Sequence, residues 1–337
     1  MARKNRNLRE KKEVLLMLVN DTMLKNYFGI DIGGTFIKGA IIDESGKVLV
    51  STKVPTERSL GRERVFSNLI LICNTLLDMA KMKLSDITAI GIGVPGMVDS
   101  ESGIVLSVSK LGWHNFDITQ RIKETLGLPA KIANDANAAA LGELKFGFRD
   151  KYRNMVLLTL GTGVGGGIII NGKLYDGNKG AGAEIGHSVI EFGGERCNCG
   201  RRGCLEAYCS ASAIIRDTKR AMEMHPDSKL WEIGSLDKVD GKTAFDYADS
   251  DPYAKEVVDS FITHLACGVT NMANIFRPEA VVLGGGVCAQ GKALTDPIQK
   301  IANDEIFAGK VGPQIKVLTA KLENDAGCLG AAALVIE

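Results

Sequence analysis

The chain has 337 residues with a formal net charge of +1, and 45% of them are hydrophobic. This length allows two domains, each with a sizeable core. The near-neutral charge provides no basic field for nucleic acid, and no run approaches the roughly 18 apolar residues of a membrane span. The basic N-terminus lacks the apolar core of a secretion signal. We therefore expect a cytoplasmic protein with no nucleic-acid or membrane partner.

Residues 1–27 are predicted to form an N-terminal helical extension. Leu15, Leu18 and Val19 lie among Lys, Arg and Glu residues, which is the pattern of one short amphipathic helix at best. Such a segment is too short for a helix-turn-helix. It could pack on the body of the protein, mediate assembly or fray.

The segment Phe28–Asp43 has the pattern of two apolar strands joined by a Gly-Gly-Thr turn. A helix is predicted over 60–82 from the spacing of its apolar residues, and a strand from Ile87 runs into the turn at Pro95 and Gly96. Loops at strand ends are where α/β sheets place ligand-binding groups.

Asp135 lies where a short strand ending at Ala133 meets an Ala-rich helix that is predicted to begin at Ala136. One interpretation is a helix N-cap, because Asn and Asp both cap well. The other is a carboxylate at the end of a strand that faces a cleft. The two interpretations are compatible, and position alone does not separate them.

The stretch 158–175 alternates an apolar strand, a glycine turn, a second apolar strand and an Asn171-Gly172 turn, which is the strongest short hairpin signal. Five glycines between Gly161 and Gly167 exceed what a turn needs. Glycine lets backbone N–H groups approach a ligand and converge on phosphate oxygens, although a strained hairpin without a ligand is the alternative. Because Phe28–Asp43 has the same pattern, we predict a duplicated domain with a nucleotide held between the copies.

The spacing H-x9-C-x-C-x4-C brings one imidazole and three thiolates into eighteen residues, which are enough to close a tetrahedral Zn²⁺ site. The predicted ligands are His187, Cys197, Cys199 and Cys204. Free cysteines or a redox pair are the alternatives. With no spare ligand, the site is predicted to be structural, and the scattered remaining cysteines indicate a reducing compartment.

Helices are predicted over 210–224 and 254–276, with a polar segment of loop or short helices between them. A buried strand over 280–287 ends in a glycine turn and is followed by a helix from about Leu294. The chain is predicted to close with a strand over 315–318 and a helix over 327–335.

Three of these motifs together resemble the phosphate and adenosine motifs of the actin-like ATPase fold in its sugar-kinase form: Asp31–Lys38, Gly161–Gly166 and Val282–Val287. Glu184-Ile-Gly-His187, followed by the cysteine cassette and Glu206, resembles the signature of the ROK family (repressor, open reading frame, kinase). The resemblance runs from about Phe28 to the C-terminus. It implies a two-domain α/β fold made of duplicated ribonuclease H-like units, with residues 28–136 plus 322–337 in a smaller domain. Residues 137–321 would form a larger domain carrying the cassette.

The resemblance also implies roles for individual residues. Asp135 corresponds to the base that takes the proton from the attacking sugar hydroxyl, and His187 would join zinc and sugar. The implied sugar ligands are Asn134, Asp135, Glu184, His187 and Glu206. The implied nucleotide-binding residues are Gly33, Gly34, Thr35 and Lys38 in the first hairpin, Gly161, Thr162 and Gly163 in the second, and Gly284, Gly285 and Gly286 against adenosine, with Asp31 near Mg²⁺.

The implied activity is ATP- and Mg²⁺-dependent phosphorylation of a hexose, with glucose favoured because 180–184 and 204–210 are similar to glucokinase members of the family. Kinases for N-acetylhexosamine, mannose or fructose share most of these motifs. A non-catalytic sugar-sensing regulator is the alternative from another class. Repressors of the family carry an N-terminal winged helix, so the short basic extension favours a kinase. The family further implies a homodimer or homotetramer.

Overall fold

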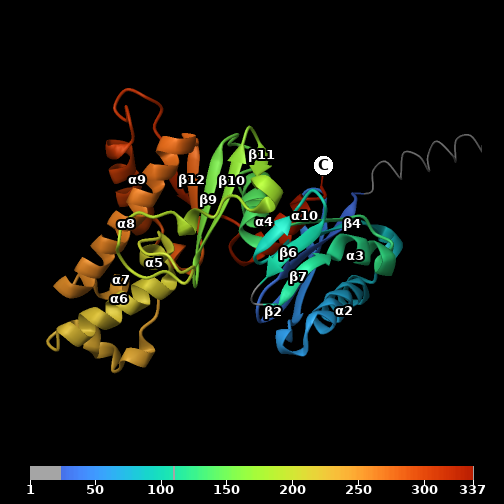
Figure 1. Cartoon of the computed structure of the whole chain (residues 1–337), viewed down its shortest axis with the longest axis horizontal. Helices are drawn as coiled ribbons and strands as arrows, with labels where there is room; N and C mark the ends of the chain where they lie inside the picture. Colours follow the sequence, from blue (N-terminus) through green and yellow to red (C-terminus); the bar gives the residue numbers. More distant parts are fainter. Residues whose placement is uncertain (1–23, 109–110, 337) are drawn as a thin grey trace, which may run out of the picture.

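The computed structural model describes residues 24–108 and 111–336 (Figure 1). The helix predicted for the N-terminal extension falls almost wholly outside the described residues. The boundary after residue 27 remains a proposal; Asn26 and Tyr27 already belong to the first strand, where they pair with Asp43 and Ile42. No helix in the described part of the chain is long and apolar enough to span a membrane.

The first half of the chain forms a five-stranded sheet in the order β3-β2-β1-β4-β8. Strands β1, β2 and β3 pair antiparallel, whereas β4 and β8 continue from β1 in parallel. Their bounds are Asn26–Ile32 (β1), Phe36–Asp43 (β2), Val48–Pro55 (β3), Ile87–Val94 (β4) and Ala130–Asn134 (β8). Helices α2 (Arg62–Ala80) and α3 (Ile118–Leu126) contribute to the core on one face. We call this part the first unit.

The second half repeats this arrangement in the order β11-β10-β9-β12-β13, again with two antiparallel pairs followed by two parallel pairs. The strands are Met155–Leu160 (β9), Val164–Ile170 (β10), Lys173–Tyr175 (β11), Ala280–Gly284 (β12) and Lys316–Thr319 (β13). The turn after β10 has positive φ at Asn171 and Gly172, as a two-residue hairpin requires. The predicted duplication is therefore confirmed by topology. We call this part the second unit.

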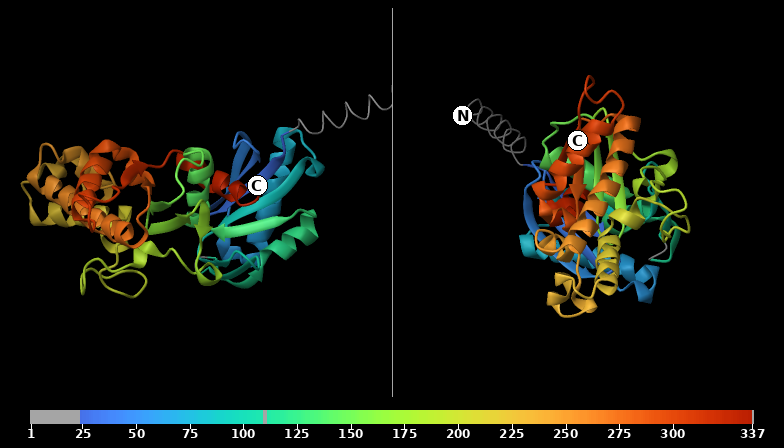
Figure 2. Two further views of the ribbon diagram at one scale, coloured as in Figure 1. Left: turned by 90° about the horizontal axis from the view of Figure 1, so that it is seen from above. Right: turned by 90° about the vertical axis from the view of Figure 1, so that its left-hand side faces the viewer.

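Most helices of the second unit lie on the side of its sheet that faces away from the first unit (Figures 1 and 2). They are α5 (Glu206–Cys209), α6 (Ala211–Met224), α7 (Thr243–Tyr247), α8 (Pro252–Phe276) and α9 (Lys292–Glu305). Short 3₁₀ helices of three or five residues connect several elements: Arg58–Leu60, Leu84–Asp86, Asn178–Gly180, Ile185–His187, Lys229–Ile233, Leu236–Lys238, Gly286–Gln290 and Glu323–Asp325.

A small three-stranded sheet in the first unit was not predicted. Its strands are β5 (Met97–Asp99), β6 (Ile104–Val108) and β7 (Trp113–Asp117). Trp113 is fully buried and its ring meets Phe116 edge to face, at 5.1 Å between centroids. Strands this short carry too little periodicity to be recognised in a sequence.

Helices α4 (Asp135–Gly142) and α10 (Ala326–Ala333) lie between the two sheets and pack against each other (Figure 1). Helix α4 covers the inner face of the second sheet, and α10 covers the inner face of the first. Their backbones come unusually close, because Gly142 of α4 faces Gly330 of α10. A Cβ at Gly91 of β4 would overlap the carbonyl oxygen of Ala331, so α10 also sits directly on backbone.

Replacing Gly91 with Ala should therefore lower the free energy of unfolding by about 3 kcal/mol, because the overlapping atom is backbone and cannot rotate away. Urea denaturation measures this loss. Gly241→Ala is the matched control, since its Cβ would make only ordinary contacts at 3.8 and 3.9 Å. Equal stability of the two variants would contradict the close approach of α10.

The domain boundaries at 136/137 and 321/322 remain a proposal. Helix α10 packs against β1, β2 and β4, which supports assigning residues 322–337 to the smaller domain. Helix α4 begins before the proposed boundary and contacts both sheets, so we expect it to belong to the connection between the domains.

Candidate functional site

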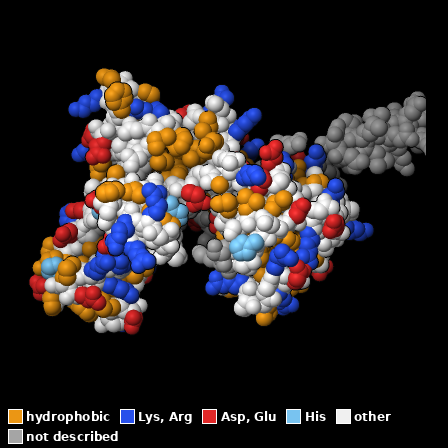
Figure 3. Space-filling model, viewed as in Figure 1, with side chains coloured by type: hydrophobic (Ala, Val, Ile, Leu, Met, Phe, Trp, Pro, Cys, Tyr) orange, Lys and Arg blue, Asp and Glu red, His pale blue; other side chains and the backbone are white. Residues whose placement is uncertain are grey.

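A cleft of about 840 Å³ lies between the two units, where Figure 3 shows the molecule hollowed between its halves. Such a volume suits a cofactor and a small substrate. Both units line it, and they bring together most of the predicted sugar and phosphate residues. These are Asp31, Asn134, Asp135, Gly161, Thr162, Gly163, Glu184, His187, Glu206 and Gly285.

Asn134 and Asp135 divide between them the two roles that position alone could not separate. Helix α4 begins at Asp135, one residue earlier than predicted, and Asn134 is its N-cap. The Asn134 Oδ1 accepts bonds from the N–H groups of Ala136 at 2.9 Å and Asn137 at 3.3 Å, and its Nδ2 donates to the Gly96 carbonyl at 3.0 Å. The Asp135 Oδ1 also accepts a bond from the Ala136 N–H at 2.9 Å, and Asp135 is exposed in the first helical turn, where the helix dipole favours its negative charge.

Asp31 lies near the end of β1, opposite Lys38 of β2, and lines the cleft. Burial raises the pKa of Asp31 above its ordinary value of 3.8, and the Lys38 charge offsets only part of this rise. Its carboxylate lies against Gly327, at the start of α10, where a Cβ would be 3.0 Å from the Asp31 Cβ. A bound cation would stabilise the ionised form of such a half-buried carboxylate.

The pKa of Asp31 is higher in the folded than in the unfolded protein, so its ionisation costs more free energy in the folded state. Protonated Asp31 therefore contributes stability below its ordinary pKa, and the wild-type protein loses this contribution as pH rises through the raised pKa. Asp31→Asn should therefore increase the melting temperature at pH 8, with the gain vanishing toward pH 4. Thermal unfolding across pH measures the difference.

Asp43→Asn is the control, because the pKa of Asp43 is lowered in the folded protein and the expected change in melting temperature therefore has the opposite sign. Burial raises the pKa of Asp43, but hydrogen bonds from the Ser45 hydroxyl and from the N–H groups of Lys47 and Ser45 more than offset this and lower it. Loss of that carboxylate should lower the melting temperature at pH 8 and matter less in acid. A fall in the melting temperature of Asp31→Asn at pH 8 would contradict the account.

The turn of the second hairpin faces the cleft and is held from behind by the start of α6. The Gly161 carbonyl accepts a bond from Ala211 N–H at 2.8 Å, and the Thr162 carbonyl accepts one from the Ser212 hydroxyl at 2.9 Å. A Cβ at Gly161 would meet nothing within 4 Å, whereas one at Gly163 would overlap the Glu206 carboxylate. The turn is therefore open toward the cleft at one glycine and closed by Glu206 at the other.

Three further glycines of this hairpin make room for packing, and two of them, Gly165 and Gly166, also line the cleft. A Cβ at Gly165 would lie 3.0 Å from the Ala136 side chain, and one at Gly167 would lie 2.8 Å from the Ala136 carbonyl oxygen. A Cβ at Gly166 would lie 2.5 Å from the Ala183 carbonyl oxygen. These three glycines let α4 and the segment before His187 pack directly on β10.

The turn of the first hairpin is fastened to Thr56, after β3. The Thr56 hydroxyl donates to the Gly33 carbonyl at 2.7 Å, and its N–H donates to the Thr35 carbonyl at 2.9 Å. Among the described residues that line the cleft there is none from this turn, nor Lys38, Gly284 or Gly286. Of the glycines after β12 only Gly285 lines it, with φ of 95° and no room for a Cβ beside the Leu160 backbone.

The four predicted metal ligands converge at one point, with their ligand atoms within 4.8 Å of one another. The Cys199 and Cys204 sulfurs are 3.7 Å apart, and the Cys197 sulfur is 3.6 Å from the His187 Nδ1. Around a tetrahedral zinc with Zn–S of about 2.3 Å and Zn–N of about 2.0 Å, two sulfurs lie ~3.8 Å apart and a sulfur and a nitrogen ~3.5 Å apart. The site therefore fits zinc, and the sulfurs are too far apart for a disulfide.

Glu206 connects this cysteine cluster with the second hairpin. Its Oε2 accepts a bond from the Val164 N–H at 3.0 Å, while its Oε1 lies 3.6 Å from the Cys197 sulfur. His187 presents Nδ1 to the same sulfur and also lines the cleft. Glu184, three residues earlier, is exposed in the cleft. The cluster thereby fixes two side chains that face the cleft.

Several residues that line the cleft were not predicted to form the site. Pro95 and Gly96 were recognised as a turn at a strand end, which was the available signal, but were given no role. Asn198 lies between two predicted metal ligands, and Gly327 comes from the last helix. Nothing in the pattern around Gly327 indicates that it meets Asp31.

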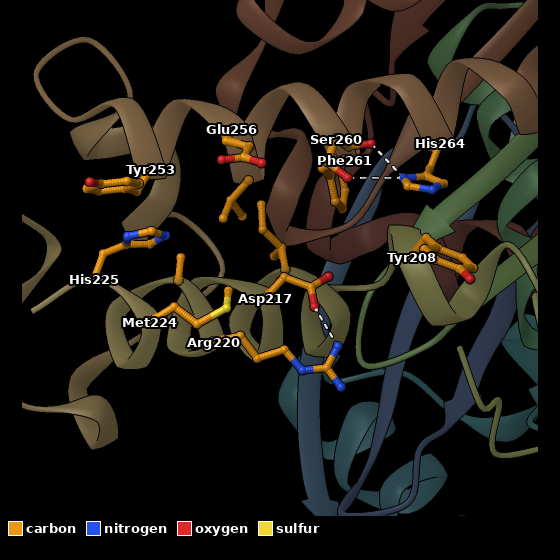
Figure 4. A pocket seen from close by; sticks show the side chains of 13 residues that line it. Tyr208, Asp217, Arg220, Met224, His225, Tyr253, Glu256, Ser260, Phe261 and His264 are labelled. Atoms are coloured by element: carbon orange, nitrogen blue, oxygen red, sulfur yellow. Dashed lines mark hydrogen bonds and ion pairs between the residues drawn. The ribbon is translucent and has the colours of Figure 1, made fainter. Parts of the chain in front are cut away.

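A second cavity, of about 250 Å³, lies between α6 and α8 and contains none of the residues predicted for sugar, nucleotide or metal (Figure 4). His225 stacks under Tyr253 at one end, with ring centroids 3.6 Å apart, and Tyr208 stacks with His264 at the other at 4.4 Å. One face of each imidazole is thus covered by a stacked tyrosine ring. The predicted site residues that the structure brings together therefore lie in the cleft between the units, not in this cavity.

Comparison with known proteins identifies the family of the chain. The ROK family matches residues 27–337. The glucokinase of Halalkalibacterium halodurans is 37% identical over 313 residues, which cover 92% of this chain and 94% of that protein. The glucokinase of Thermotoga maritima is 38% identical over 312 residues, covering 92% and 96%. The xylose repressor of Caldicellulosiruptor bescii is 29% identical, and the match covers 97% of this chain and 81% of the repressor.

Among solved structures, a ROK family glucokinase from Streptomyces griseus in complex with glucose and AMPPNP superposes with a TM-score of 0.77 at 34% identity, over 92% of this chain and 98% of that one. A ROK hexokinase from Thermus thermophilus gives a TM-score of 0.74 at 29% identity, over 91% and 97%. These neighbours confirm the actin-like sugar-kinase fold predicted from the motifs. The chain belongs to the ROK family.

Proposed function

We propose that this protein is an ATP-dependent hexose kinase that converts glucose to glucose 6-phosphate. The observation that carries the proposal is the cleft, in which Asp135 from the first unit faces the glycine turn, Glu184, His187 and Glu206 from the second. The similarity to glucokinases at 34–38% identity over most of the chain supports glucose as the sugar.

Asp135 would act as the general base that takes the proton from the attacking sugar hydroxyl. Its exposed position in the first turn of α4 leaves the carboxylate accessible from the cleft. The backbone N–H groups around Gly161 to Gly163 would hold phosphate oxygens, and Asp31 would hold Mg²⁺. When bound, Mg²⁺ would supply charge neutralisation at the transferred phosphoryl group, and the residues of the cleft would mainly position the reactants.

The sugar would be held by hydrogen bonds to Glu184, His187, Glu206 and Asn134. Carboxylates accept bonds from adjacent hydroxyls, and a site built for hydroxyls rejects analogues that lack them. Asn134 uses its oxygen as a helix cap and one amide hydrogen on Gly96. It therefore has one further hydrogen with which to reach a sugar oxygen.

Fewer of the residues proposed to bind the nucleotide line the cleft than of those proposed to bind the sugar. Gly285 lines the cleft and would lie against adenosine, together with Gly284 and Gly286. Gly33, Gly34, Thr35 and Lys38 would approach the phosphates when the two units close over their substrates. Such closure excludes water and suppresses hydrolysis of ATP.

We further propose that His187, Cys197, Cys199 and Cys204 hold one structural zinc ion. Four protein ligands leave no position for a reacting water. The ion would fix the His187 ring and, through Cys197, the position of Glu206. In this arrangement the metal orients residues of the sugar site from behind.

A cytoplasmic location and a homodimer or homotetramer complete the proposal. All eight cysteines are unpaired, which supports a reducing compartment. The assembly follows from the family resemblance alone, and sedimentation analysis of the purified protein tests it.

The second candidate is a sugar-sensing regulator, which the 29% identity to xylose repressors favours. The experiment that separates the candidates is ADP release with ATP and Mg²⁺ across glucose, mannose, fructose and N-acetylglucosamine. We expect the highest kcat/KM with glucose. Greater turnover of another sugar would correct the substrate, and binding of sugars with no turnover of any would favour the regulator.

A further inference from the structure

The chain passes between the two units twice, and one side chain, Glu143, links the two connecting segments. We call these segments the first and the second passage. The first passage runs from α4 through a single π-helical turn, Glu143–Gly147, toward β9, and the second runs from β13 to α10. Glu143 belongs to the first passage, and its carboxylate reaches Lys321 and Leu322 of the second. These residues are 178 and 179 positions apart from it in the sequence.

The contacts of Glu143 are made with backbone. Its Oε1 accepts bonds from the N–H groups of Lys321 at 2.9 Å and Leu322 at 2.8 Å, and its Oε2 accepts one from Lys321 at 3.0 Å. The side chain is fully buried. A Cβ at Gly147 would overlap its carboxylate, so that glycine leaves the space it occupies.

Glu143 does not serve to bind a cationic side chain. No ion pair involves it among the described residues, and the Lys321 ammonium lies over the Phe148 ring, 4.7 Å from its centroid. Burying a carboxylate is costly, and burial raises the pKa of Glu143 even though the hydrogen bonds from the Lys321 and Leu322 N–H groups offset part of this rise. A side chain that served only to fill space would not need an oxygen that accepts bonds from both N–H groups.

The local backbone is unusual at the same point. Glu143 opens the π-helical turn, which its own carbonyl closes by accepting a bond from the Phe148 N–H at 2.7 Å. Arg149 and Asp150 follow with positive φ, which non-glycine residues seldom adopt. Such π-helical turns occur frequently at functional sites. Just before the turn, α4 and α10 touch backbone to backbone at Gly142 and Gly330.

We propose that Glu143 is a positioning residue of the hinge, whose carboxylate ties the two passages together so that the units rotate about one axis when the cleft closes. The proposal rests on the phosphotransfer function proposed above, since closure matters only if the cleft binds its substrates. Loss of the tie leaves α4 and α10 free to slide, so the closed cleft admits water. ATP is then hydrolysed without transfer to the sugar.

The test compares Glu143→Ala with Asp251→Ala, a matched buried carboxylate that is 2% exposed. Asp251 also accepts backbone bonds, from Tyr253 at 2.8 Å and Ala254 at 3.2 Å, but it caps α8 wholly within the second unit. Two quantities are measured with Mg²⁺-ATP and glucose: the ratio of ADP to glucose 6-phosphate, and the fall in radius of gyration that glucose causes in X-ray scattering.

We expect Glu143→Ala to raise the ADP ratio at least fivefold and to reduce the scattering change, whereas Asp251→Ala lowers only the melting temperature. Glu143→Gln keeps an oxygen acceptor for both N–H groups and should restore the ratio to within twofold of the wild type. Equal ratios and equal scattering changes for Glu143→Ala and the wild type would overturn the proposal. Should Glu143→Ala not fold, Glu143→Asp, whose shorter side chain cannot reach both N–H groups, decides by the same criteria.

A failure of the proposed function is distinguishable from a failure of the hinge. Wild-type protein that makes no glucose 6-phosphate contradicts the function. In that case the fall in radius of gyration on glucose binding decides alone whether Glu143 controls closure. An equal fall for Glu143→Ala and the wild type would contradict the role of Glu143 in the hinge.

Discussion

Asp135→Asn should reduce kcat for glucose by about 10²–10⁴-fold while leaving the dissociation constant for glucose within a few-fold of the wild type. Asparagine has the same shape and still tolerates the start of a helix, but its amide cannot take up the proton. Initial rates of ADP formation measure kcat, and calorimetric titration measures sugar binding.

Asp99→Asn is the control for this experiment. Asp99 lies in β5 of the same unit, and its carboxylate accepts a bond from the Ser102 N–H at 3.2 Å on the surface. We expect wild-type turnover from it. Turnover of Asp135→Asn within threefold of the wild type would show that another group is the base.

Cys199→Ser should reduce the zinc content from about one ion per chain to nearly none and should strongly lower the melting temperature. Cys199 is the exposed ligand of the four, so its replacement removes little buried surface, and the effect reports the loss of the metal bond. A structural zinc contributes apparent binding energies of about 10–16 kcal/mol in small peptides, all of which supports folding. Metal analysis of protein purified without chelator, followed by thermal unfolding, gives both quantities.

Cys267→Ser provides the comparison, because Cys267 is half-buried on α8 and lies outside the one metal-ligating cluster found among the described residues. Its zinc content should equal that of the wild type. Wild-type protein without zinc, or Cys199→Ser with a full complement, would remove the ion from the account.

The duplicated fold was predictable because its evidence is local. Each unit begins with two apolar runs joined by glycines, and Asn171-Gly172 specifies its hairpin within two residues. The small sheet was missed because β5 to β7 are too short for periodicity to show. The packing role of the β10 glycines was not predicted, because a sequence shows glycine without showing what lies against it; Gly165 and Gly167 lie against α4.

The site was predictable where one segment contains the whole arrangement, as in the cysteine cluster with His187. Which of Asn134 and Asp135 is the N-cap could be decided only from the observed start of α4, which is one residue earlier than the start predicted from the sequence. Contacts between distant segments had no local signal. Gly327 against Asp31, and Glu143 against Lys321, exist only because α4 and α10 pack together between the sheets.

The most direct test of the central claim is to incubate the protein with glucose, ATP and Mg²⁺ and to quantify ADP and sugar phosphate together by ³¹P NMR. The account predicts glucose 6-phosphate and ADP in equal amounts. Glucose that binds in the cleft but is never phosphorylated would contradict it.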